Sequence, residues 1–446
     1  MRTLRILSAL ALAAFLVAPK TAGAKPPIYI SFHWHMHQPV YWPYESVIQT
    51  ADANRYGFSV TQVHNDRSGP YTTWPADAVR AGRDAGFGHF GAQVSLSGSL
   101  SENLNALAAA GKGFADWKAP WAEAAGWKTD LGNPRLDLVR FGYHHPLMPL
   151  VHPDDIRRQI ALHDRALKDR VSSAYGTSKG MFPPETGFSP EIIPTLAGAG
   201  VEWVIVDNIH FDRAHVDYPY GKGSNLIPPN PADQRNAATT DWVQLQNIWA
   251  GSKVSAPWGY QPHYVAWIDP DSGVETRIIA VPGARYEGNE DARGGFGALQ
   301  YESVLSQYEA QNTDDDHPML IVLHHDGDNF GGGSDSYYHS NWAQFIDWLK
   351  GKPDRFQETT IQDYLDRFPP AADDVIHVEP GSWAGADNGD PEFLKWNADP
   401  DASGYSPDRA SWAVVTAGGN RVRTAQANRP EPDVGDVMNG TGGDIA

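Results

Sequence analysis

The chain contains no cysteine in its 446 residues. This absence excludes a disulfide framework, a thiolate nucleophile and a zinc site built from cysteine. Basic residues are also scarce, because 35 Lys and Arg stand against 54 Asp and Glu, giving a formal net charge of −19. An acidic protein repels nucleic acid and anionic membranes, so we expect neither as a partner, and a neutral partner suits this charge.

Long apolar runs are equally rare. One occupies residues 7–17, after Arg2 and Arg5 and before the small residues 22–24. This order predicts an export signal over residues 1–24. The run is too short to span a bilayer, and no other run reaches ~18 residues. We therefore expect a secreted or periplasmic protein with no membrane contact after cleavage, whose oligomeric state the sequence leaves open.

Residues 28–37 alternate between apolar side chains and serine or histidine. Period-two alternation predicts a strand, here with His33, His35 and His37 on one face and Gln38 just beyond it. Further strand-like and helix-like segments follow in turn, at 91–107, 155–171, 189–199, 201–207, 319–323, 340–351 and 360–367. Polar residues just past strand ends are typical of a β/α barrel, whose site lies at the carboxyl ends of its strands.

The barrel is expected to span residues 25–370. An insertion rich in Asn, Pro and Trp interrupts it near 212–264. Residues 371–424 turn to Gly, Asp and Pro and form a C-terminal extension with a short helix near 409–417. The polar residues 425–446 are expected to form a poorly ordered tail.

Few of the acidic residues directly follow an apolar run. Glu185, Asp207, Asp326 and Asp328 do, and they lie far apart along the chain. Cleavage of a glycosidic bond needs two carboxyl groups that flank it, one to donate a proton and one to attack or to activate water. These acids are therefore the candidates for such a pair.

Several motifs occur in an order that resembles a known family. They are His35-Met36-His37-Gln38-Pro39, 98–107, 143–150, Phe182-Pro183-Pro184-Glu185-Thr186 and 324–331. In register over roughly residues 28–330, they are similar to the motifs of glycoside hydrolase family 57. The resemblance implies an α/β fold, an incomplete (β/α)7 barrel followed by a helical region. It also implies an oligo- or polysaccharide substrate, most often an α-linked glucan, and no cofactor in the chemistry.

Carried onto this sequence, the resemblance makes Glu185 the nucleophile of a retaining mechanism. Asp326, directly before Gly327, becomes the general acid/base. Retention requires carboxyl groups about 5–5.5 Å apart. Asp328 stands where the family commonly has Glu, so it remains open as an alternative proton donor.

The sequence departs from the family pattern elsewhere. Phe182 replaces the usual Trp, Pro183 the usual Leu, and His325 a common Asp. Residues 381–424 look like the start of the family's C-terminal helical region, and 439–442 resemble a stretch inside it. The helical region is therefore expected to be shortened.

The remaining candidates are residues expected to contact sugar. They are His35, His37, Gln38, Trp34, Trp42, His145, Asp207, His210 and Asp328. A ring face suits the apolar face of a pyranose, although most tryptophans are core residues. Purely structural roles stay open for some of them: His33 in the core, His145 in a turn, and Asp207 with His210 as a buried pair.

Two other functions remain in view. The histidines of residues 33–37 could bind zinc in a mannosidase or deacetylase of a related barrel, but no Asp lies beside them, so we expect no metal. A non-catalytic glycan-binding protein is the third reading. The segment 399–404 partly resembles a calcium loop, yet Ala410 stands at position 12, so we expect a turn.

Overall fold

The computed structural model describes residues 25–213, 242–247, 253–288, 298–328, 339, 341–383, 393–429, 431 and 433–439. The expected export signal and much of the expected insertion lie outside these residues. The strands are β1 (Ile28–Met36), β2 (Ala92–Leu96), β3 (Leu136–Leu138), β4 (Gly180–Met181), β5 (Trp203–Asp207), β6 (Trp242–Gln244), β7 (Lys253–Ser255), β8 (His263–Ile268), β9 (Glu275–Gly283), β10 (Leu320–Asp326), β11 (Phe356–Glu358) and β12 (Val375–Ile376).

The α-helices follow most of the strands. They are α1 (Val47–Asp52), α2 (Val60–Asn65), α3 (Ser68–Tyr71), α4 (Trp74–Asp84), α5 (Gly98–Ala109), α6 (Lys118–Ala124), α7 (Pro153–Ala166), α8 (Ile193–Gly198), α9 (Ile209–Asp212), α10 (Arg285–Gly288), α11 (Ala298–Leu305), α12 (Trp342–Lys350), α13 (Ile361–Arg367), α14 (Pro407–Gln426) and α15 (Val434–Asn439). The strand and helix segments expected from periodicity are confirmed, with ends that differ by a few residues.

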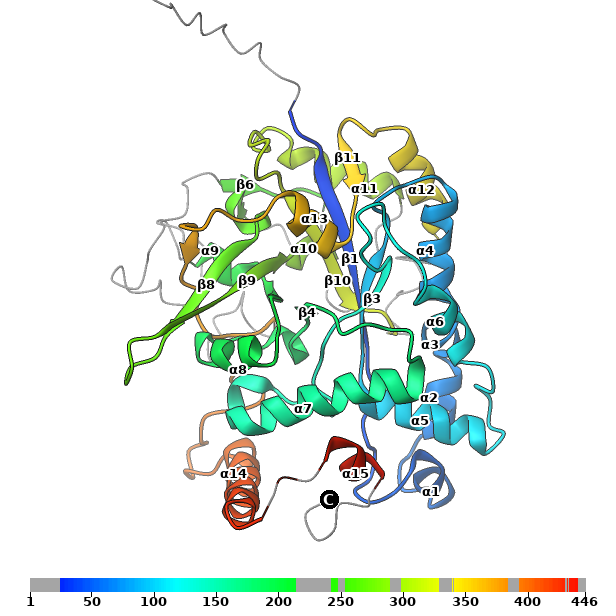
Figure 1. Cartoon of the computed structure of the whole chain (residues 1–446), viewed down its shortest axis with the longest axis vertical. Coiled ribbons are helices and arrows are strands. Elements are labelled where there is room, and N and C mark those ends of the chain that lie inside the picture. The colour runs from blue at the N-terminus through cyan, green and yellow to red at the C-terminus, as the bar shows by residue number, and fades with distance from the viewer. Residues whose placement is uncertain are drawn as a thin grey trace, which may run out of the picture.

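Seven parallel strands curl into the expected incomplete barrel (Figure 1). Parallel pairing runs from β4 through β5, β9, β10, β1 and β2 to β3. An isolated bridge from Arg140 to Met181 brings the chain after β3 against β4. Strand β8 pairs antiparallel with β9 and carries β12 at its other edge. The carboxyl end of β1 points toward the side of the molecule where α1 and α7 lie.

Strand β1 explains why the barrel has a polar interior at this point. Its apolar face packs outward, where the ring of Phe32 lies 4.9 Å from that of Trp342 on α12. Its other face turns toward β2, where Ser31 donates a hydrogen bond to Gln93 at 2.9 Å. The alternation of the sequence thus becomes an apolar layer under the helices and a polar layer inside the barrel.

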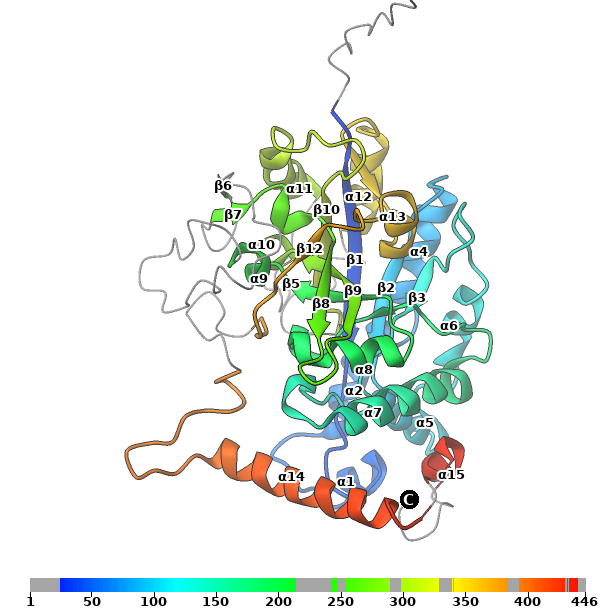
Figure 2. The same cartoon turned by 60° about the vertical axis from the view of Figure 1, so that its left-hand side comes forward.

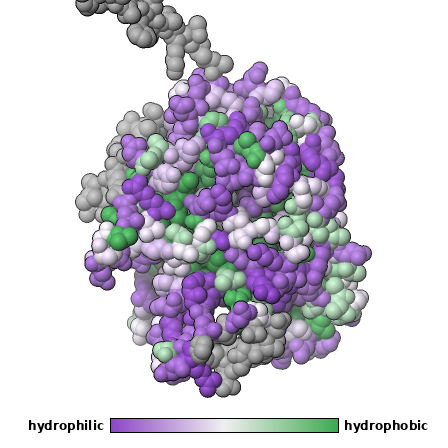
Figure 3. All heavy atoms as spheres, in the orientation of Figure 1, coloured by the Kyte–Doolittle hydropathy of each residue, from purple (hydrophilic) through white to green (hydrophobic). Residues whose placement is uncertain are grey.

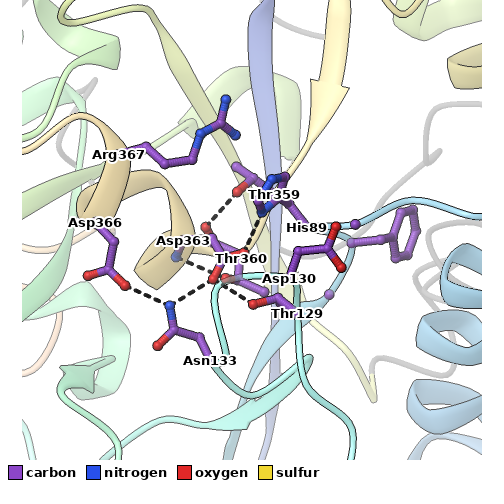
Figure 4. Close-up of polar contacts among 12 residues, drawn as sticks. His89, Thr129, Asp130, Asn133, Thr359, Thr360, Asp363, Asp366 and Arg367 are labelled. Atoms are coloured by element: carbon purple, nitrogen blue, oxygen red, sulfur yellow. Dashed lines mark hydrogen bonds and ion pairs between the residues drawn. The ribbon is translucent and has the colours of Figure 1, made fainter.

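At the opposite end of the barrel, Asp363 on α13 is the centre of a hydrogen-bond network that joins separate segments (Figure 4). This buried carboxylate contacts His89 Nδ1 at 2.7 Å and accepts hydrogen bonds from Thr129 Oγ1 at 2.8 Å and Asn133 Nδ2 at 2.7 Å. The three partners lie in the segments that lead into β2 and β3. The network therefore fixes the amino ends of these strands, a position that supports stability rather than chemistry.

The C-terminal extension differs from expectation. Helix α14 is longer than the expected short helix, and α15 forms within the stretch expected to be poorly ordered. Both lie beyond α7 at the same end of the molecule (Figure 2). The reason is contact with α7: Arg423 pairs with Asp155 at 3.0 Å, and Glu431 with Arg158 at 3.0 Å.

The face of the molecule in Figure 3 is mostly hydrophilic, as an acidic composition leads one to expect. Among the described residues, no helix combines enough length with enough apolar character to cross a bilayer.

Candidate functional site

The histidine face of β1 meets a serine face on its neighbour β2. His35 Nδ1 lies 2.8 Å from Ser95 Oγ, and His33 Nε2 lies 3.1 Å from the same oxygen. His37 Nδ1 lies 3.0 Å from Ser97 Oγ. Neither serine was among the residues expected at the site, although their period-two spacing is the same signal that identified the histidines.

Glu185 lies just beyond β4, in a turn of unusual backbone conformation. Its φ is 59°, that of Thr186 is 48°, and that of His145 is 62°. Left-handed backbone at residues other than glycine is costly, and such strain concentrates at functional sites. Other residues share this conformation, among them Tyr44, Asn54 and Phe114, but His145 and Glu185 also contact each other, which supports a functional role for this turn.

His145 connects Glu185 to β1. Its Nε2 lies 3.5 Å from Glu185 Oε1 and 3.2 Å from His35 Nε2. The Glu185 side chain remains 27% exposed, so a ligand can reach it. Three of the residues expected at the site therefore lie together, at the carboxyl ends of β1 and β4.

The second oxygen of Glu185 has a partner that our sequence reading did not assign to the site. Trp383 Nε1 donates a hydrogen bond to Glu185 Oε2 at 2.6 Å. The two residues are 198 positions apart, and no local pattern relates them. One indole N–H and one imidazole thus hold the two carboxyl oxygens, which fixes the direction of the group.

Asp326 ends β10, the other neighbour of β1. Its Cα pairs in register with that of His35, and Gly327 N donates to His35 O at 2.7 Å. Asp326 is partly exposed. Glu185 is thus linked to His35 through His145, and Asp326 lies beside His35 in the strand register.

Phe182 packs the segment that leads to Glu185 against β1. Its ring stacks on His33 with centroids 4.1 Å apart, and the ring of His35 lies 5.3 Å away. The aromatic residue that replaces the usual Trp therefore forms part of the floor beneath the histidines.

Asp328 lies deeper than Asp326. Its Oδ2 accepts hydrogen bonds from Tyr71 OH at 2.7 Å and from His37 N at 3.2 Å. Gln38 Nε2 donates to the same tyrosine oxygen at 2.9 Å, so Gln38 supports this arrangement rather than standing free. Tyr71 is a further residue that our sequence reading missed. Burial raises the pKa of Asp328 from 3.8 to about 6.

The Asp328→Asn variant should therefore gain stability relative to the wild type as pH rises. The folded protein holds the Asp328 proton more tightly than the unfolded chain does, so this stabilisation is complete below about pH 4 and is lost by about pH 6. We expect the difference in unfolding free energy to widen by up to roughly 3 kcal/mol across this window. Urea unfolding of both proteins at pH 4, 5, 6 and 7 measures it, and a pH-independent difference would contradict the assignment.

The site histidines are uncharged near neutral pH. Burial holds the pKa of His35 and His37 well below its ordinary value, and the neighbouring imidazoles lower it further. Burial also lowers the pKa of His145, although Glu185 opposes the shift. At 3.5 Å from Glu185 Oε1, His145 Nε2 therefore belongs to a neutral ring and does not form an ion pair there. The three neutral rings offer donors and acceptors that suit sugar hydroxyls.

The two candidate tryptophans have different surroundings. Trp34 is fully buried in the core beside Phe32 and Trp342, so in this structure its ring offers no face to a sugar. It occupies the outward face of β1, opposite the histidines. Trp42 is 43% exposed, with the guanidinium of Arg55 4.5 Å from its ring centre.

Asp207 and His210 are buried and bonded within the protein. Asp207 Oδ2 accepts from Arg285 Nη1 at 3.0 Å, and His210 Nε2 lies 3.1 Å from Ser382 O. Neither side chain reaches solvent, in contrast to the direct sugar contact expected for them. Arg285, which begins α10 just after β9, was not among the residues expected at the site.

Within the described residues, no group of three or more His, Cys, Asp or Glu side chains is arranged to hold a metal ion. Residues 399–404 contain a turn in which Asp401 Oδ1 accepts from Ser403 N at 2.8 Å.

Comparison with known proteins adds independent information. The family model described as Glycosyl hydrolase family 57 matches residues 125–233. An alpha-amylase of Niallia circulans is 32% identical over 361 residues, which cover 75% of this chain and 26% of that protein. A 4-alpha-glucanotransferase of Thermococcus litoralis is 22% identical over 247 residues, covering 53% of this chain and 28% of that protein. This chain therefore spans about a quarter of the length of these two relatives.

The crystal structure of a GH57-type branching enzyme from Pyrococcus horikoshii superimposes with a TM-score of 0.55. The match has 13% sequence identity and covers 91% of this chain and 80% of that one. At this low sequence identity, the structural similarity shows that the two proteins share a fold and shows nothing about activity.

Proposed function

Because the chain belongs to glycoside hydrolase family 57, we propose that it is an exported, retaining enzyme that hydrolyses or transfers α-linked glucan. Its relatives include proteins named alpha-amylase and 4-alpha-glucanotransferase, and this proposal extends their activities to the present chain. Export rests on the signal-like residues 1–24. The partner is an oligo- or polysaccharide.

In the proposed reaction, a carboxylate oxygen of Glu185 attacks the anomeric carbon, and an ester forms as the glycosidic bond breaks. Asp326 gives its proton to the departing oxygen. In the second half, ionised Asp326 takes a proton from water or from a sugar hydroxyl, whose oxygen then displaces Glu185. Two displacements on the same carbon retain the anomeric configuration.

One observation carries the proposal. Glu185 is held by Trp383 and His145 at the carboxyl end of the barrel, and Asp326 ends the strand beside His35, to which His145 is bonded. A flanking pair needs two carboxyl groups from different strands at one end of the barrel, and the backbone positions of Glu185 and Asp326 are consistent with this need.

Incubation with maltooligosaccharides and with pullulan tests the function. We expect shorter or longer oligosaccharides from the wild type, with the α-anomer formed first by NMR, and none from Glu185→Gln. An enzyme that depends on zinc would lose activity in chelator, whereas the proposed one would not. A glycan-binding protein without catalysis would retain oligosaccharide in both forms and release nothing, which would refute the enzymatic proposal.

A further inference from the structure

Residues 380–383, which we name the strap, pass directly beside Glu185. All four of their carbonyl groups accept a hydrogen bond from the barrel. Gly381 O accepts from the backbone N–H of Phe188 at 2.9 Å, and Gly381 N donates back to Phe188 O at 3.0 Å. The other three carbonyls are bonded by side chains, in the contacts Arg213 Nη1 to Pro380 O at 3.4 Å, His210 Nε2 to Ser382 O at 3.1 Å and Arg285 Nη1 to Trp383 O at 2.5 Å.

The side-chain donors follow β5 and β9 and are themselves fixed. Arg285 also donates to Asp207 Oδ2, in an ion pair whose side chains are 2% and 0% exposed. Burial keeps the pKa of His210 near 4, so its ring is neutral and its Nε2 proton is available to Ser382 O. The residues expected to touch sugar at this end of β5 thus hold the strap instead.

Gly381 shows how closely the strap lies on the barrel. A Cβ atom at this position would come within 2.1 Å of the His210 ring. Any residue other than glycine at this position would therefore push the strap away from α9.

The strap ends at the Glu185 contact. Trp383 N lies 3.4 Å from Glu185 O, and Trp383 Nε1 donates to Glu185 Oε2 at 2.6 Å. Arg285 fixes the main chain of the same tryptophan. The path from the buried ion pair to the carboxylate therefore contains one residue, Trp383.

We propose that the Asp207–Arg285 pair and the strap form a positioning device that aims the Glu185 carboxylate through Trp383. This inference rests on the proposed function of Glu185. In this account Arg285 is a positioning residue that never touches the sugar, and Trp383 supplies the directional hydrogen bond. Because the indole donates to Oε2, the attacking oxygen in this account is Oε1, which lies 3.5 Å from His145 Nε2.

Trp383→Phe tests the last link, because it keeps a ring and removes the donor. We expect kcat on maltooligosaccharides to fall about 10- to 100-fold with KM changed less than about threefold, the size of one hydrogen bond to a charged group. Trp412→Phe is the matched control, since it removes the indole bond to Trp396 O in the same C-terminal extension. An unchanged kcat in Trp383→Phe, with an active wild type, would overturn the inference.

Hydrogen–deuterium exchange tests the anchor independently of catalysis. In Arg285→Gln we expect the amides of residues 377–383 to exchange at least tenfold faster than in the wild type and in Trp412→Phe, with partial recovery of protection and of kcat in Arg285→Lys. Should Arg285→Gln fail to fold, Arg285→Lys and Trp383→Phe carry the test. Unchanged exchange in a folded Arg285 variant would refute the device. Inactivity of the wild type would instead refute the proposed function, and exchange would still decide whether Arg285 holds the strap.

Discussion

Replacing Glu185 with glutamine is expected to lower kcat by about 10⁴-fold or more. The amide keeps the size of the side chain and can still meet Trp383 and His145, but it is too weak a nucleophile to attack the anomeric carbon. Because sugar contacts remain, we expect oligosaccharide affinity to change little. Initial-rate kinetics with a maltooligosaccharide, together with calorimetric titration, separate these two quantities.

Glu191→Gln provides the control for this change. Glu191 is an exposed acid six positions further along the chain, where its backbone N–H bonds to Ser189 Oγ. Its replacement alters the charge equally and should leave kcat unchanged. If Glu185→Gln released sugar at the wild-type rate, Glu185 would be removed from the mechanism.

Asp326→Asn should lower kcat by roughly 10²- to 10⁴-fold on natural glucans, because the departing oxygen then leaves without a proton. A glycosyl fluoride needs no such proton, so formation of the glycosyl-enzyme from it should be nearly normal. Rates measured on both substrates distinguish loss of the acid from general damage.

Asp328→Asn is the informative comparison for that experiment. Asp328 is bonded to Tyr71 and to the backbone of His37, whereas Asp326 is partly exposed at the strand end. We expect Asp328→Asn to slow both substrates alike, and by less. A loss confined to natural glucans in Asp328→Asn, with Asp326→Asn unaffected, would exchange the roles of the two acids.

The sequence predicted the parts of the fold that depend on local periodicity. Alternation in β1 identified both its core face and its histidine face, and the apolar runs before Asp207 and Asp326 identified β5 and β10. The carboxyl-end rule then placed Glu185 and Asp326 at one end of the barrel, where the structure has them. These features depend on neighbours along the chain, which a sequence displays directly.

Other features depend on contacts between distant segments. Trp383 reaches Glu185, and Tyr71 reaches Asp328, across hundreds of residues with no shared motif. The left-handed backbone at His145 and Glu185 could not be predicted either, because neither residue type favours that conformation. Trp34 could have been excluded as a sugar contact by its place on the apolar face of β1, a conclusion that the alternation itself supports.

The C-terminal extension illustrates a related difficulty. The residues of α14 and α15 read as polar and weakly patterned, and none of the α14 side chains is buried. Ion pairs with α7, such as that of Arg423 with Asp155, hold this extension against the barrel, and the hydrophobic pattern of the sequence does not predict them.

The most direct test of the central claim is covalent trapping. The wild-type protein would be incubated with 5-fluoro-α-glucosyl fluoride, whose glycosyl-enzyme forms quickly and hydrolyses slowly, and then digested and mapped by mass spectrometry. The account predicts one fluoroglucosyl ester per chain, on the peptide that contains Glu185. An ester on any other acid, or complete hydrolysis with inversion and no adduct, would contradict it.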